Sequence, residues 1–142
     1  MSVRRLLATT AAILAVLLGG CSVVNPTSPA EQAAMDAITA QIQHTLEQRP
    51  DVVSARVTYQ NSLDASERAD ASVKVKGGTD FAPVLDDTER LIWQSRLAPL
   101  SSLTIGIVDA DNLQRGDVRR VDLSDQTTVR ALQARYGPRP VK

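Results

Sequence analysis

The residues with the most reactive side chains are few in this chain. It has one histidine, His44, and one cysteine, Cys21. A zinc site needs three or four ligands, and a catalytic histidine needs a serine or carboxylate brought close to it. His44 lies about 200° around the first expected helix from Ile42, so we expect it to point to solvent. We therefore predict no catalytic residue, metal or cofactor, and we do not expect an enzyme.

Two acidic segments could in principle bind a cation or transfer protons. Segment 109–112 (Asp-Ala-Asp-Asn), with Gly116 beyond it, has oxygen ligands but lacks the third acidic position and the final glutamate of a calcium loop. We expect a polar loop between two strands. Asp86, Asp87 and Glu89 fall on the solvent side of the second expected helix, where acids favour the helix dipole. Neither segment predicts catalysis.

The N-terminal residues have the pattern of an export signal. Two arginines at 4–5 precede an apolar run over residues 6–20. This run is shorter than the roughly 20 residues of a transmembrane helix, and it matches the hydrophobic region of a secretory signal. The lone Cys21 follows it directly. A plain signal peptide or a signal anchor with an incidental cysteine is the alternative.

The residues Leu18, Gly19, Gly20 and Cys21 resemble the bacterial lipobox. The resemblance implies that the Cys21 thiol receives a diacylglycerol, that the signal over 1–20 is cut away, and that the new amine is often acylated. Two or three acyl chains anchor a protein firmly. We therefore expect attachment to the extracytoplasmic side of the cell membrane, through a tether over 21–27 that reaches at most about 25 Å.

Composition fits one small domain after the signal. The chain has 142 residues, with 16 basic and 16 acidic side chains, and two of the basic ones belong to the signal. The remaining slight acidic excess gives no basic footprint for nucleic acid, so we expect no nucleic-acid partner. One cysteine excludes an internal disulfide.

Hydrophobic periodicity predicts an α+β fold in the order α-β-β-α-β-(β)-α. We expect a two-layer sandwich with helices on one face of a three- to four-stranded antiparallel or mixed sheet. The first two strands should form an antiparallel hairpin with a long polar loop over 61–68. The pattern leaves open whether residues 117–136 pack on this sheet. The single domain spans 28–137, before a tail over 138–142; its expected elements are helices at 28–48, 81–96 and from Ser124 or Asp125 to Tyr136, and strands at 53–60, 69–76, 102–107 and 118–123.

Two features are candidates for partner binding. Trp93 lies about 120° off the apolar face of the second helix, where a tryptophan is typical of an interface anchor. The alternative is that the C-terminal helix covers it, against Tyr136. The outer face of the sheet is polar and mildly basic, which suits a partner domain or an anionic headgroup, although such faces are more often only solvated. The candidate partner-binding residues are Trp93, Arg56, Lys74 and Lys76, and the expected outer face also carries Thr58, Gln60, Ser72 and Thr104.

Three segments, 50–57, 69–75 and 103–109, resemble in order the strands of the small α-β-β-α-β ring-building domain of secretion and flagellar ring proteins. The resemblance spans 50–111 and implies a fold; no second ring domain or C-terminal transmembrane helix accompanies it. The whole chain also resembles small lipoproteins of actinobacteria. These patterns favour a non-enzymatic envelope scaffold or accessory protein with an envelope protein partner. The alternative is a lipoprotein that binds a lipid or glycan fragment.

Overall fold

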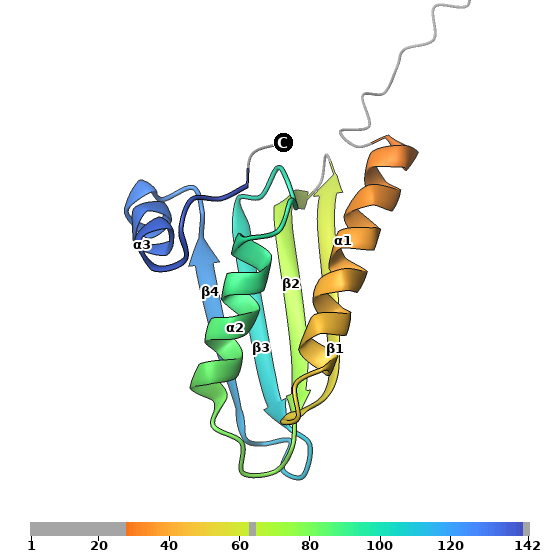
Figure 1. The fold of residues 1–142 in the computed structure, drawn as a ribbon, viewed down its shortest axis with the longest axis vertical. Helices are drawn as coiled ribbons and strands as arrows, with labels where there is room; N and C mark the ends of the chain where they lie inside the picture. Colours follow the sequence, from red (N-terminus) through yellow and green to blue (C-terminus); the bar gives the residue numbers. More distant parts are fainter. Residues whose placement is uncertain (1–27, 63–64, 141–142) are drawn as a thin grey trace, which may run out of the picture.

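The computed structural model describes residues 28–62 and 65–140. The predicted α+β class is confirmed, with a mixed four-stranded sheet and the predicted order of elements (Figure 1). The elements are α1 (Pro29–Glu47), β1 (Val52–Ser62), β2 (Ala65–Val75), α2 (Phe81–Trp93), β3 (Ser102–Asp109), β4 (Gly116–Asp122) and α3 (Gln126–Tyr136).

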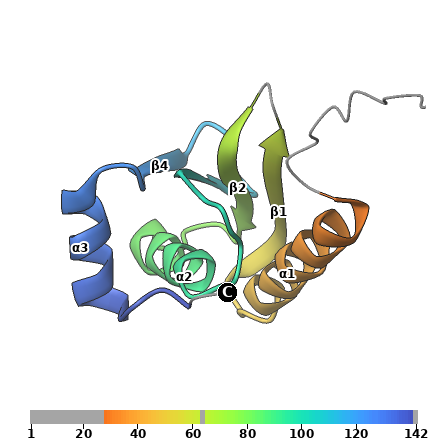
Figure 2. The same ribbon diagram turned by 90° about the horizontal axis from the view of Figure 1, so that it is seen from above.

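The sheet has the strand order β1-β2-β3-β4. β1 and β2 pair antiparallel, as predicted, while β2 and β3 run parallel because α2 connects them across one face. β4 then returns antiparallel to β3. Both α1 and α2 lie on the same side of the sheet, and the opposite side carries no helix (Figure 2). The predicted two-layer arrangement is therefore confirmed.

Local sequence signals determine where the helices begin. Ser28 caps α1 by accepting a hydrogen bond from the Glu31 N–H at 3.2 Å, and the Glu31 carboxylate accepts from the Ser28 N–H at 2.9 Å. This reciprocal capping box confirms the predicted start. Asp80 caps α2, and Asp125 caps α3. α2 ends at Trp93, three residues before the predicted end.

Two predictions about the first hairpin are wrong. The alternation of Val53 with Ala55, Val57 and Tyr59 predicts that Val53 faces inside. A register shift between Val52 and Ser54 instead buries Val52 and leaves Val53 51% exposed. Such a bulge adds one residue to a strand and reverses the alternation on one side of it. The expected loop over 61–68 is largely strand, because pairing continues to Ser62 opposite Ala65. Polar residues can extend a strand wherever they face solvent.

The core lies between the sheet and the two covering helices. Within the described residues, its most buried large side chains come from both layers. The scarcity of aromatic residues leaves aliphatic side chains to form this core, as their alternation predicts. The largest fully buried side chains are Leu46, Val73, Val75, Val84, Thr88, Ile92, Leu97 and Ile105.

The C-terminal segment packs against the side of α2 that is distant from α1. β4 forms the edge of the sheet, two residues earlier at its start than expected, and α3 lies beyond it beside α2 (Figure 2). Glu89, which was predicted to face solvent, is only 5% exposed. The prediction is wrong because Arg119 of β4 and Tyr136 of α3 cover this side of α2.

Candidate functional site: the open face of the sheet

The face of the sheet opposite α1 and α2 is covered by no helix of the described chain. Strand register places outward side chains in rows across all four strands. One row holds Arg56, Ser72, Gly106 and Val118 as successive neighbours. The outer positions predicted from the sequence are exposed or half-exposed here: Arg56, Thr58, Gln60, Ser72, Lys74, Lys76 and Thr104.

This open face is basic although the protein is not. It carries five cations and two acids, whereas the other described residues carry eight cations and thirteen acids. The charges are therefore separated between the two sides of the fold, which creates a positive potential over the sheet. The charged residues of the open face are Arg56, Arg68, Lys74, Lys76 and Arg120, with Asp70 and Asp122.

Four of these five cations make no ion pair within the described residues. Only Arg68 pairs on this face, with Asp70 at 3.2 Å; the four others are Arg56, Lys74, Lys76 and Arg120. Arg56 and Lys74 occupy diagonal positions on neighbouring strands, where Cα atoms lie about 7–8 Å apart. Two like charges at this spacing repel each other, so a bound anionic group would be stabilised by both.

A shallow hollow of about 450 Å³ lies beside these two cations. Gly106 leaves space there, because a Cβ atom at this position would meet no atom nearer than the Ala71 carbonyl oxygen at 4.0 Å. Val118, 52% exposed, adjoins the glycine on β4 and adds apolar surface. The residues around the hollow include Ser54, Arg56, Ser72, Lys74, Gly106 and Val108.

Sequence reasoning found part of this site. It placed Arg56 and Lys74 on one face, because both alternate with apolar residues. It missed Arg120 and Val118, which reach the face only through the register of β4 against β3. The one signal for the hollow was Gly106, a glycine inside an apolar strand pattern, which indicates a bulge or a close approach.

Trp93 does not belong to the open face. Its side chain is 4% exposed, and its indole N–H donates to the Gly137 carbonyl oxygen at 2.9 Å. The alternative interpretation, that the C-terminal segment covers Trp93, agrees with this packing. The structure therefore brings Arg56, Lys74 and Lys76 to one surface and separates Trp93 from them.

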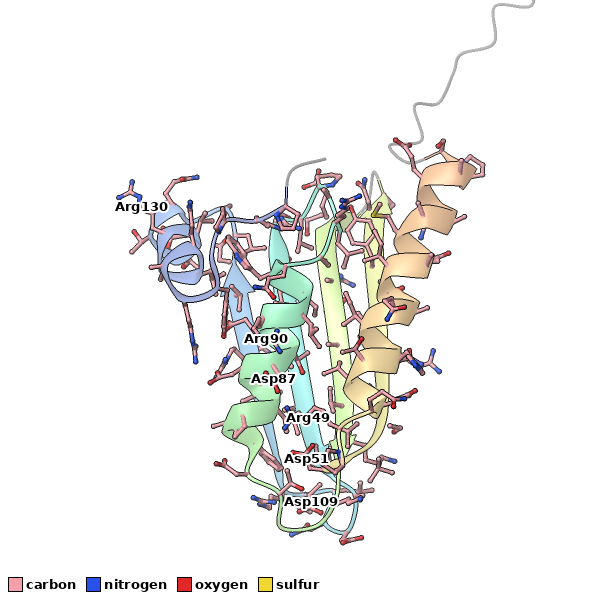
Figure 3. All side chains as sticks on the ribbon, viewed as in Figure 1. Arg49, Asp51, Asp87, Arg90, Asp109 and Arg130 are labelled. Carbon is pink, nitrogen blue, oxygen red and sulfur yellow. The ribbon has the colours of Figure 1, made fainter. Side chains whose placement is uncertain are left out.

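The acidic residues of α2 form ion pairs within the fold. Arg49, after α1, binds Asp51 at 2.8 Å and also contacts Asp87, which pairs with Arg90 at 3.1 Å (Figure 3). These pairs connect the end of α1 to α2. They are partly exposed, so each contributes little to stability by itself.

A second polar cluster joins α2 to β4 and α3. Arg119 donates to Asp86 at 2.7 Å and to buried Glu89 at 3.2 Å, and Arg135 pairs with Asp86 at 2.6 Å. The Arg119 hydrogen bond is the main cause of a lowered pKa at Asp86. The Tyr136 hydroxyl donates to Glu89 at 2.9 Å, and burial, followed by this hydrogen bond, raises the pKa of Tyr136 to about 12. The cluster positions the C-terminal segment.

The segment that faintly matched a calcium loop is a closed turn. The Asp109 carboxylate is buried and accepts from the N–H groups of Asp111 and Gly78, at 2.8 and 3.2 Å. It also accepts from Arg115 at 2.8 Å. The Asp111 hydrogen bond, followed by Arg115, lowers the pKa of Asp109. Its lone pairs are therefore occupied by the protein, as expected for a structural loop.

Other predicted features have the following positions. His44 is exposed on α1, as expected. Residues 28–62 and 65–140 contain no group of three or more potential metal ligands, and no helix there is long and apolar enough to cross a membrane. Leu18, Gly19, Gly20 and Cys21 lie outside the described residues, so the lipobox stays a prediction.

No family model matches this chain, and neither the curated proteins nor the solved structures include a significant match to it. The resemblance of residues 50–111 to ring-building domains therefore stays a prediction about the fold. The geometry of the open face is the feature of the described chain that points to a function.

Proposed function

We propose that this chain is a lipid-anchored envelope protein that docks an acidic partner protein on the open face of its sheet. The observation that carries the proposal is the basic hollow between Arg56 and Lys74 on an otherwise uncovered sheet. Charge complementarity of this kind directs encounter and selects partners. Exposed Val118, which adjoins Gly106 on this face, supplies apolar contact of the kind that interface centres need.

The position of the hollow supports a protein partner over a membrane surface. The tether joins the fold at the start of α1, and α1 is a 19-residue helix about 28 Å long. β1 follows the far end of α1, so Ser54 and Arg56 lie toward the end of the sheet that is distant from the tether (Figure 1). An upright domain presents this surface away from the membrane.

The proposed role is binding without catalysis. The polar clusters outside the open face form hydrogen bonds within the fold. Asp109 accepts from the backbone of its own turn, and Glu89 accepts from Arg119 and Tyr136. A scaffold or accessory subunit needs only the anchor and the docking face. Cys21 supplies the anchor in this proposal.

Two variants test the two parts of the proposal separately. Cys21→Ala should move the protein out of the membrane fraction and abolish the mass of the acyl groups. The double variant Arg56→Glu/Lys74→Glu should stay lipidated and folded but lose its partner in chemical crosslinking in cells. Its matched control is Arg96→Glu/Arg130→Glu, which makes the same charge change at exposed arginines without ion pairs in the described chain.

The result that opposes docking is equal partner capture by both double variants, or none by lipidated wild type. A membrane-bound Cys21→Ala variant opposes the anchor alone and leaves the docking face to be judged by the charge reversals.

A further inference from the structure

A second cavity, of about 290 Å³, lies on the helical side of the fold, away from the open sheet face. It is formed where the C-terminal segment crosses α2 and the ends of β4 and α3. Its walls are apolar except for one amide and one guanidinium. The lining residues are Trp93, Leu100, Leu123, Val129, Gln133, Pro138 and Arg139.

Arg139 is an unusual lining residue, because it brings a charged side chain to a cavity with mainly apolar side chains. Its Nε is buried and has no hydrogen-bond partner, and no other buried side-chain nitrogen or oxygen of the described chain lacks one. One Nη donates to the Leu97 carbonyl oxygen, and the guanidinium carbon lies 5.9 Å from the centre of the Trp93 ring. Buried donors in native proteins almost always have a partner, so the Arg139 guanidinium is not fully satisfied by the described residues.

The charge of Arg139 is also uncompensated. It makes no ion pair with a carboxylate in residues 28–62 or 65–140, in contrast to Arg49, Arg119 and Arg135. Burial lowers the pKa of Arg139, and Tyr59 opposes this shift only in part. A guanidinium is still charged at neutral pH, so the cavity holds one half-buried positive charge beside apolar side chains.

We propose that this cavity binds a small amphipathic monocarboxylate, whose carboxylate pairs with Arg139 and whose apolar body packs against Trp93 and Val129. The planar fork of a guanidinium matches a carboxylate in two parallel hydrogen bonds. Pockets of a few hundred Å³ with apolar walls and few polar groups are typical of small-molecule sites. A neutral sugar would find only Gln133 as a further polar side chain here. This binding site is independent of the proposed docking role.

Trp93 makes the test direct, because it is the only tryptophan of the chain and lines the cavity. The protein can be used from Ser22 onward, since the core formed by the described residues runs from Met35 to Tyr136. Octanoate is the probe and octanol its uncharged counterpart. We expect a saturable change of Trp93 emission with octanoate. Octanol should bind at least about tenfold more weakly, because it lacks one hydrogen bond between charged groups.

Two variants assign the binding to this cavity. Arg139→Gln should weaken octanoate binding at least about tenfold for the same reason, whereas Arg130→Gln should leave it unchanged, because Arg130 points outward from α3 (Figure 3). Val129→Phe should block binding by filling the cavity while Arg139 remains, which covers the case in which Arg139→Gln does not fold. Circular dichroism checks folding of each variant.

The proposal is overturned by a folded wild type whose Trp93 emission shows no saturable response to octanoate. It is equally overturned if octanol binds as tightly as octanoate, or if folded Arg139→Gln or Val129→Phe binds as tightly as wild type. Equal loss in the Arg139→Gln and Arg130→Gln variants would identify non-specific adsorption and also oppose it.

Discussion

Replacing Gly106 by valine should stabilise the protein and impair docking at the same time. The glycine sits in the middle of β3, its φ is not positive, and a Cβ there has 4.0 Å to its nearest neighbour. Glycine inside a strand is less stable than alanine by roughly 0.5–1 kcal/mol. A valine would also pair across the strands with Val118, a contact of about 0.2–1 kcal/mol. We therefore expect the free energy of unfolding to rise by about 1 kcal/mol.

The same side chain would occupy the hollow beside Arg56 and Lys74. Capture of the partner in cells should then fall, although the fold is more stable and no charge has changed. Urea denaturation measures the first effect, and the midpoint of thermal unfolding should rise by roughly 4 °C. Thr104→Val is the matched control, because Thr104 lies on the same face of the same strand but outside the hollow. It should change neither quantity appreciably.

A Gly106→Val variant that is less stable than wild type would refute the reasoning about space at the open face. A variant that is more stable but captures its partner as well as wild type would refute the role of the hollow.

Three further predictions concern the parts of the fold that position the site. Gly116→Ala should cost about 1–3 kcal/mol in urea denaturation, because its Cβ would lie 2.8 Å from the Ile107 carbonyl oxygen; a neutral result would contradict that close approach. Tyr136 should ionise near pH 12 in a spectrophotometric titration. Its contribution to the free energy of unfolding should be complete below the unfolded pKa of about 10 and should be lost as pH rises toward 12. A Tyr136 titration near pH 10 would oppose this. Asp86 has a lowered pKa, so its contribution to the free energy of unfolding should be present above its ordinary pKa of 3.8 and lost as pH falls below that value. Arg119→Gln should weaken this loss of stability at acidic pH, measured by urea denaturation at a series of pH values. An unchanged pH dependence would contradict the assignment.

Local signals in the sequence were sufficient to predict the fold class and most elements. The capping box at Ser28 and the alternation around Val73 and Ile105 depend on neighbouring residues only, so they can be read without the tertiary structure. Val53 could not be placed, because a bulge depends on the register against β2. The strand ends near Ser62 were missed because their polar residues match both a loop and a solvated strand.

The side of α2 that faces the C-terminal segment required the tertiary structure. A helical wheel assigns one apolar face, and Glu89 and Trp93 fall outside it. β4 and α3 cover them and supply Arg119, Tyr136 and the Gly137 carbonyl as partners. For the same reason the cavity at Arg139 could not be predicted from local patterns, because its lining residues are spread between positions 93 and 139.

Site-specific photo-crosslinking from the open face tests the docking proposal most directly. A photoreactive residue at Ser72, in the hollow, is compared with one at exposed His44 on α1, on the opposite side of the fold. We expect a discrete adduct in cells from position 72, absent from position 44, and lost when Arg56→Glu/Lys74→Glu is added. Its captured protein should present an acidic surface to the crosslink. No adduct from position 72 in lipidated, folded protein, or the same adducts from both positions, would contradict the account.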